Sequence, residues 1–238
     1  MTSGADTFED RVTAFARDVS DLIARTVVPS EPCGIQITSS ENNGQPRALV
    51  ELRPDTDARY VTVRIGGNDA AGLTVRIGCR PDSSGRYMAA TESAFAIYST
   101  LDRTPLFRLD YREAMRSAPS SHWQVHAERG ALSNLLTIGG HNRPHNLAAL
   151  HIPVGGARLR PGLEDFLQFV IDELGADSRE GWRDVLNESR ATWRRRQIAS
   201  AVRDVPDEAV RVLRLLGYSV EPPGSGDGRT RDDTLYKW

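Results

Sequence analysis

All five histidines of this 238-residue chain lie within residues 122–151. They are His122, His126, His141, His145 and His151. Histidine is the side chain whose charge changes nearest neutral pH, and it is also the commonest metal ligand. We therefore expect the chemistry of the protein in this stretch.

The spacing of the histidines allows two kinds of chemistry. His122 and His126 are four residues apart, as are His141 and His145, and this spacing places both rings on one face of a helix or of a strand. Together with His151 they could hold zinc or another divalent first-row metal. Without a metal, one neutral imidazole could accept a proton while an imidazolium donates one, which suits the cleavage of phosphodiesters or other esters.

We predict a catalytic set of His122, His126, Glu128 and His151. In this set His122 and His126 act as acid and base, Glu128 assists them and His151 closes the site. In the alternative, the histidines are structural, as half-buried rings bonded to backbone carbonyls or as solvated rings in a loop. Catalysis requires the rings to converge on one cleft, whereas scattered rings and an apolar patch on the C-terminal helices indicate a binding protein.

Composition narrows the class of protein. The chain is 39% hydrophobic and 26% charged with a formal net charge of -2, which is typical of a globular protein and gives no general attraction to nucleic acid. It lacks the run of about 18 apolar residues that a membrane helix needs. Acidic residues from Asp6 to Asp21 are unlike a secretory leader, so we expect a cytoplasmic protein that binds no membrane. The two cysteines exclude a disulfide framework and a cysteine-rich zinc site.

Sequence periodicity predicts an N-terminal helix followed by strands. Apolar residues recur at helical spacing from Phe8 to Ile23, behind Thr7 as N-cap and with Asp10 in the first turn. Alternation with period two then predicts six strands, at residues 34–38, 48–53, 60–65, 73–79, 94–100 and 106–111. The third and fourth of these strands form the clearest hairpin, with a turn at residues 66–72.

The remainder of the chain is predicted to be mixed and then helical. Residues 121–125 and 147–154 can be extended, and residues 127–136 favour a short helix. Three helices follow, over residues 163–174, about 178–204 and 206–216. We expect the last helix to bury Leu213 and Leu216 and to end at Gly217.

These elements predict an α+β fold with an N-terminal helix, a mostly antiparallel sheet of five or six strands, and a C-terminal helical bundle. We expect residues 1–160 to form a domain that holds the sheet and the histidines. Residues 161–220 should form a helical subdomain, and residues 221–238, which are rich in glycine and charge, a disordered tail.

Around His126 the chain resembles the zinc-dependent nucleoside and nucleobase deaminases. His126 and Glu128 precede a predicted strand and a helix that begins at Pro161, which is similar to the HxE…PCxxC order of that family. The resemblance covers roughly residues 125–165, and it implies that the histidine binds zinc and the glutamate shuttles protons. Gly162 and Asp165 stand where the family has its two zinc-binding cysteines, so the thiolate ligands are missing.

Two further resemblances involve the histidine stretch. The predicted strand at residues 106–111, followed by His122 and His126, resembles the TumE-type toxins of small bacterial toxin–antitoxin pairs, which implies nuclease activity by analogy. Residues 121–127 and 150–156 are similar to an uncharacterised protein family from high-GC actinobacteria. That family implies no function.

Arginines give the long C-terminal helix a basic side. They are Arg190, Arg194, Arg195 and Arg196. These side chains could contact the phosphates of a nucleic acid, and Trp193 could stack on a base. In the alternative they form a solvated face, because acidic residues on the same helix partly neutralise them. The C-terminal helices could also bind a protein partner or a second copy of the chain.

Two functions remain open from the sequence. The first is an intracellular hydrolase that uses the histidine cluster, with or without a divalent metal, on nucleic acid or a nucleotide. The second is a non-catalytic partner-binding or regulatory protein of the defence or toxin–antitoxin type, whose histidines are structural.

Overall fold

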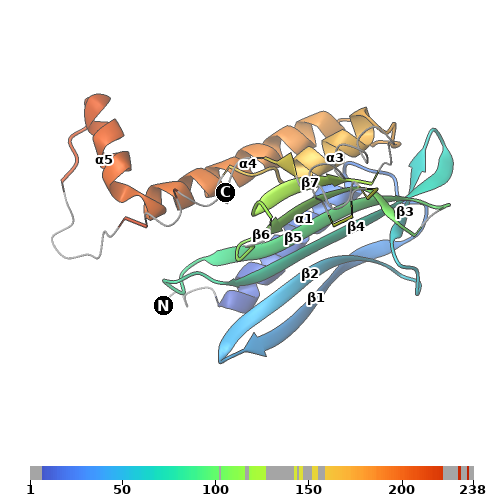
Figure 1. The fold of residues 1–238 in the computed structure, drawn as a ribbon, viewed down its shortest axis with the longest axis horizontal. Helices are drawn as coiled ribbons and strands as arrows, with labels where there is room; N and C mark the ends of the chain where they lie inside the picture. The colour runs from blue at the N-terminus through green and yellow to red at the C-terminus, as the bar shows by residue number, and fades with distance from the viewer. Residues whose placement is uncertain are drawn as a thin grey trace, which may run out of the picture.

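A computed structural model of the chain describes residues 7–101, 103–115, 118–126, 142–143, 145–146, 152–154, 159–221, 230–231 and 235. The architecture is α+β, with an N-terminal helix, one antiparallel sheet and helices that follow it (Figure 1). The predicted fold class is confirmed. In the part of the chain that the structure describes, we find no helix with the length and apolar character needed to cross a membrane.

Helix α1 (Phe8–Ala24) begins at the predicted capping box. The Thr7 hydroxyl accepts a hydrogen bond from the Asp10 N–H at 3.1 Å, and the Asp10 carboxylate accepts one from the Thr7 N–H at 3.0 Å. These two bonds satisfy donors that the first turn of a helix otherwise leaves unpaired. The buried side of α1 carries Val12, Ala16, Val19, Leu22 and Ile23.

In the part of the chain that the structure describes, the sheet has eight strands, and all neighbouring strands are antiparallel. The strands are β1 (Cys33–Asn42), β2 (Gln45–Pro54), β3 (Val61–Ile65), β4 (Asn68–Pro81), β5 (Met88–Ser99), β6 (Pro105–Arg112), β7 (Ser121–Val125) and β8 (Ile152–Pro153). Their order is β1-β2-β4-β5-β6-β7-β8, and β3 pairs with β4 beside β2. The sheet exceeds the expected five or six strands because the extended segments β7 and β8 both add to its edge.

The β3–β4 hairpin is confirmed, but its turn is shorter than predicted. Gly66 and Gly67 both have positive φ angles, 57° and 79°, and they form a two-residue turn whose twist matches that of the strands. Pairing therefore resumes at once between Ile65 and Asn68. Residues 68–72, which the sequence places in the turn, belong to β4.

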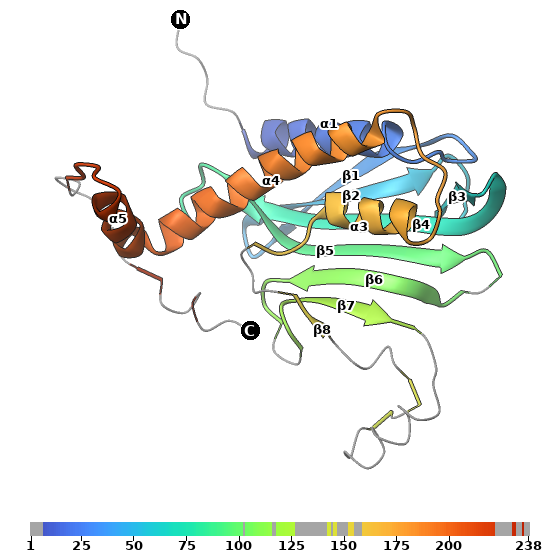
Figure 2. The same ribbon diagram turned by 90° about the horizontal axis from the view of Figure 1, so that it is seen from above.

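One face of the sheet is covered by helices, and the core lies between them. Figures 1 and 2 show α1, α3 (Leu163–Asp172) and α4 (Trp182–Asp204) on this same face. Phe166 of α3 is fully buried, 6.0 Å from Phe95 of β5 and 5.7 Å from Trp123 of β7 between ring centroids. One core cluster therefore contains residues from both sides of position 160.

The beginnings of the C-terminal helices follow from local chemistry. The Asp165 carboxylate accepts a hydrogen bond from the Gly162 N–H at 2.9 Å, so the two residues that replace the cysteines of the deaminase pattern cap α3. Helix α4 begins at Trp182, later than predicted, because Ser178 forms an isolated bridge with Val27 and Gly181 has a φ of 72°. Gly217, with a φ of 87°, follows α5 (Pro206–Leu215) as expected.

Helix α5 lies clear of the sheet. Helix α4 has 23 residues and so extends over about 35 Å, and Figures 1 and 2 show that its C-terminal half carries α5 beyond the end of the strands. No residue of α5 is buried. The expectation that Leu213 and Leu216 are inside is therefore wrong, since their exposed fractions are 38% and 69%.

Two predicted segments fall largely outside the described residues. They are the helix at residues 127–136 and the tail at residues 221–238. Two described residues of the tail contact the end of α4 and the start of α5. Thr230 donates a hydrogen bond to Asp207 at 2.8 Å, and the Arg231 N–H donates one to the Asp204 carbonyl at 2.7 Å.

Gly72 provides a test of the packing on the uncovered face. A Cβ at this position would overlap the ring of Tyr60, which stacks on Tyr98 with centroids 5.7 Å apart. We expect Gly72→Ala to lower the free energy of unfolding by roughly 1–3 kcal/mol. The control Gly34→Ala, where a Cβ meets nothing within 4 Å, should change it by less than about 0.5 kcal/mol. Urea denaturation measures the stability of both variants. Equal stability of the two variants would contradict the close packing of Tyr60 on Gly72.

Candidate functional site

Strand β7 places His122 and His126 on the same face of the sheet. Trp123 of β7 packs against the core, so its neighbour His122 lies on the opposite face, away from the helices. The His126 N–H donates a hydrogen bond to the Leu106 carbonyl at 3.0 Å, which continues the pairing of β7 with β6. The four-residue spacing therefore has the consequence expected of a strand.

His122 has the surroundings of a structural histidine. It is 1% exposed, and its Nδ1 lies 2.8 Å from the Pro119 carbonyl oxygen. Because a carbonyl oxygen only accepts, Nδ1 carries the hydrogen and donates it. A buried ring bonded to a backbone carbonyl is what the structural alternative predicts.

The surroundings of the His126 ring differ from those of His122. It is half-buried, and its Nε2 is buried without a hydrogen-bond partner among the described residues. Burial lowers the pKa of the imidazole, the Arg108 guanidinium lowers it further, and the Asp110 carboxylate opposes both effects. Arg108 and Asp110 form an ion pair at 2.9 Å. A neutral ring at neutral pH can accept a proton.

The structure covers only part of the remaining predictions about the histidine stretch. Glu128, His141 and His151 lie outside the described residues, and His145 is exposed. Among the residues that are described, no group of three or more His, Cys, Asp or Glu side chains could hold a metal ion. Of the predicted catalytic set, the structure brings His122 and His126 to one face, and the rest of the set stays a prediction.

Of the four arginines that form the predicted basic side of α4, three contact acidic residues of the body. Arg190 Nε lies 2.9 Å from the Asp165 carboxylate, and Arg194 Nη2 lies 3.7 Å from the same group. Arg196 pairs with Asp18 of α1 at 3.4 Å. These pairs hold α4 against α3 and α1, which explains much of the basic run without a nucleic acid. Arg195 is exposed, and nucleic-acid binding stays a prediction.

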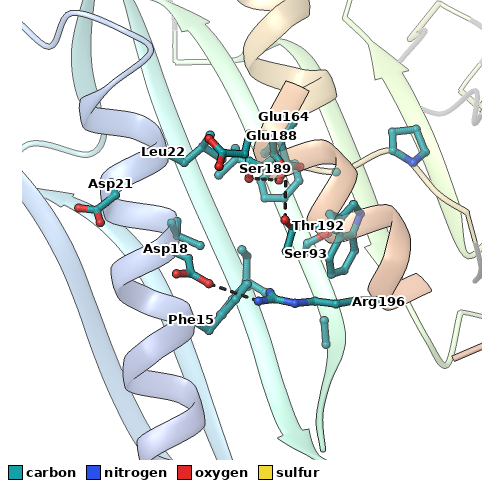
Figure 3. A pocket seen from close by; sticks show the side chains of 18 of the residues that line it. Phe15, Asp18, Asp21, Leu22, Ser93, Glu164, Glu188, Ser189, Thr192 and Arg196 are labelled. Atoms are coloured by element: carbon teal, nitrogen blue, oxygen red, sulfur yellow. Dashed lines mark hydrogen bonds and ion pairs between the residues drawn. The ribbon is translucent and has the colours of Figure 1, made fainter. Parts of the chain in front are cut away.

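A cavity of about 320 Å³ lies where α1, α4 and the start of α3 meet strands β4 and β5 (Figure 3). Its apolar walls include Phe15, Val19, Leu22, Ile77, Phe95, Leu163 and Val185. Its polar lining includes Asp18, Asp21, Arg25, Ser93, Arg160, Glu164, Glu188, Ser189, Thr192 and Arg196. An apolar cavity with a few convergent polar groups has the general form of a small-molecule site.

Glu164 and Arg160 are the two buried charged residues in the lining of this cavity. Glu164 is 7% exposed, and the Ser189 hydroxyl donates a hydrogen bond to its carboxylate at 2.6 Å. Burial raises the pKa of the Glu164 carboxyl, and the Ser189 bond opposes the rise. In Figure 3 Glu164 and Ser189 lie at one end of the cavity, and the Asp18–Arg196 pair crosses from α1 to α4 at the other end.

The segment before α3 is fixed by close contacts that the sequence does not reveal. The Arg160 guanidinium lies over the Tyr111 ring at 3.6 Å and near the Trp193 ring at 5.1 Å. Gln197 of α4 donates a hydrogen bond to the Arg160 carbonyl at 2.9 Å. A Cβ on Gly162 would lie 2.9 Å from Trp193 Nε1, so a larger residue does not fit there without movement.

The C-terminal arm, which we define as residues 198–218, concentrates exposed apolar surface. Of the thirteen large hydrophobic side chains that are exposed among the described residues, seven lie in the arm. They are Ile198, Val202, Val212, Leu213, Leu215, Leu216 and Tyr218. Along α5, Ala209, Val212, Leu213 and Leu216 follow the spacing of one apolar helix face.

Comparisons with known proteins give no relative for this chain. No family model, no curated protein and no solved structure matches it. The resemblances to deaminases, to TumE-type toxins and to an actinobacterial family therefore stay predictions.

Because the Glu164 carboxyl is buried, we predict that it makes the stability of the protein depend on pH. Because its pKa is raised in the folded state, the folded chain holds this proton more tightly than the unfolded chain. The stabilisation is complete at acidic pH and is lost as the pH rises through the folded pKa. We therefore expect the stability of Glu164→Gln relative to the wild type to increase from acidic to neutral pH.

Denaturant unfolding at a series of pH values measures this difference. Glu180→Gln, the same change at an exposed position just before α4, is the control. A constant difference between Glu164→Gln and the wild type across the series would show that burial does not perturb the Glu164 carboxyl.

Proposed function

We propose that the protein is a non-catalytic partner-binding protein and that its C-terminal arm is the docking element. The observation that carries the proposal is that α5 is an amphipathic helix with no buried residue. The proposal includes a cytoplasmic location, which we expect from the sequence alone.

The energetics of the arm favour a bound state. Each fully buried leucine side chain contributes about 1.5–3 kcal/mol relative to an exposed one. Leu213, Leu215 and Leu216 forgo much of this contribution, since their exposed fractions are 38%, 74% and 69%. Exposed apolar patches of this kind mark protein interaction sites, and an amphipathic helix docks by laying its apolar face in a groove.

The charges of the arm suit an apolar rather than a strongly charged partner. Arg211 pairs with Glu208 within α5 at 2.6 Å, and Arg214 donates a hydrogen bond to the Val220 carbonyl at 3.1 Å. Arg203 lies over the Tyr87 ring at 4.5 Å. The polar side of the arm is thus engaged within the chain, which leaves its apolar side for the partner, whether another protein or a second copy.

The double variant Leu213→Glu with Leu216→Glu tests the arm. We expect it to fold like the wild type, because neither side chain is buried, and to weaken binding about a hundredfold or more, because two apolar contacts are replaced by desolvated charges. Leu101→Glu, at a leucine that is 95% exposed in the β5–β6 turn, is the matched control. The partner is isolated with the tagged wild-type chain, and the affinity is then measured between purified components.

Sedimentation of the wild-type chain over a wide concentration range separates a second copy from a different partner. Self-association that the arm variant abolishes identifies a homo-oligomer. The proposal fails if the wild type neither self-associates nor forms a stoichiometric complex, or if the arm variant binds as tightly as the Leu101→Glu control.

His126 supports a second candidate, a hydrolase that acts on nucleic acid or a nucleotide. Its Nε2 is buried and unpartnered among the described residues, and its pKa is lowered, so the ring is neutral at neutral pH and can accept a proton. His122 would then position β7, and Glu128 and His151 remain the proposed assisting groups. This candidate ranks second because His122 donates to a backbone carbonyl instead of facing a reacting group.

Cleavage of a labelled single-stranded RNA tests the second candidate. If the hydrolase proposal is correct, His126→Ala loses the activity because the general base is missing, by about a hundredfold or more. His145→Ala, at an exposed histidine, keeps it. Absence of cleavage by the wild type, or equal cleavage by both variants, excludes His126 as a catalytic base for RNA.

A further inference from the structure

The cavity beneath α4 is not used by the docking proposal, and its charges indicate a ligand. The arm begins after Gln197, whereas the residues of α4 that line the cavity lie between Val185 and Arg196. The volume of about 320 Å³ is at the lower end of the range for small-molecule sites. Aromatic and aliphatic walls from α1, β5 and α4 suit an apolar ligand body.

Two of the three arginines in the lining are engaged within the protein. Arg196 pairs with Asp18 at 3.4 Å. Arg160 lies over the rings of Tyr111 and Trp193. Apart from these groups, the charged lining consists of Asp21, Glu164, Glu188 and Arg25. With Glu164 ionised, the whole lining has four carboxylates, Asp18, Asp21, Glu164 and Glu188, against three arginines, so it is net acidic and an anionic ligand is disfavoured.

Among the described residues, no arginine forms an ion pair with the Glu164 carboxylate. Ser189 donates a neutral hydrogen bond to its carboxylate at 2.6 Å. The side chain of Arg190 is directed to other acceptors, namely the Asp165 carboxylate at 2.9 Å and Gln168 Oε1 at 2.6 Å. A buried carboxylate is costly unless it is paired, and a charge-assisted bond from an ammonium group removes that cost.

We propose that this cavity binds an organic amine with an apolar body, whose ammonium group donates to the carboxylate of Glu164. The aromatic and aliphatic walls, which include Phe15 of α1 and Phe95 of β5, take the body of the ligand. A neutral alcohol of the same shape fills the same space but leaves the carboxylate uncompensated. A carboxylate of the same shape adds a second negative charge beside it.

Three compounds of nearly equal shape test the proposal. They are phenethylamine, phenethyl alcohol and hydrocinnamate, and calorimetric titration at neutral pH measures their affinity for the full chain. We expect the amine to bind at least about tenfold more tightly than the alcohol, a difference of about 1.4 kcal/mol, and hydrocinnamate to bind most weakly. Equal affinities, or preference for hydrocinnamate, would overturn the proposal.

Variants assign the selectivity to this cavity. Glu164→Gln keeps the shape of the side chain, and we expect it to remove the preference for the amine over the alcohol. Glu180→Gln, an exposed glutamate outside the cavity, should keep that preference. Thr192→Phe places a larger side chain at an exposed position of α4 that lines the cavity, so it should fill the cavity and weaken the binding of all three compounds. Unchanged selectivity in Glu164→Gln, or unchanged binding in a folded Thr192→Phe protein, contradicts the assignment.

Discussion

The attachment of α4 to the body is the constraint on which the rest of the structure depends. Its ties are the Arg190–Asp165 ion pair at 2.9 Å, the Ser189–Glu164 hydrogen bond at 2.6 Å and the Gln197–Arg160 hydrogen bond at 2.9 Å. All of them lie in the part of the helix that crosses the core. The helix has 23 residues, so its last turns extend past this support and carry α5 away from the sheet.

This geometry gives the two halves of α4 different roles. Over the core, α4 closes the cavity against α1 and buries Glu164 beside Ser189. Beyond Gln197, it presents Ile198 and Val202 to solvent and leads to the apolar face of α5. A ligand under the first half and a partner on the second half would share one helix. Under the two proposals the protein acts as a scaffold for binding, with His122 fixed inside it.

Much of the fold could be predicted because its signals are local. The Thr7–Asp10 capping box, the alternating strands and the positions of Gly217 and Pro206 depend on neighbours in sequence. The two-residue turn at Gly66 and Gly67 was harder to predict because residues 68–72 fit either a loop or a strand. The exposure of Leu213 and Leu216 could not be predicted, since apolar periodicity shows which face of a helix is apolar but not whether anything covers it.

The candidate sites depended on contacts between distant residues and were predicted less well. Spacing indicated that His122 and His126 share a face. It did not indicate that the Pro119 carbonyl accepts a hydrogen bond from His122, or that Nε2 of His126 has no partner among the described residues. Nothing in the sequence indicated that Glu164 is buried, because acidic residues are common in the first turn of a helix, where they are ordinarily exposed to solvent. Its hydrogen-bond donor Ser189 lies 25 residues away in the chain.

Amide hydrogen exchange tests the central claim most directly. The account predicts that in the isolated chain the amides of α5 exchange much faster than those of α1, and that in the complex with its partner or second copy exchange slows in α5 and stays unchanged in α1. If α5 is as protected as α1 in the isolated monomer, or if the complex protects another surface and leaves α5 unchanged, the arm is not the docking element.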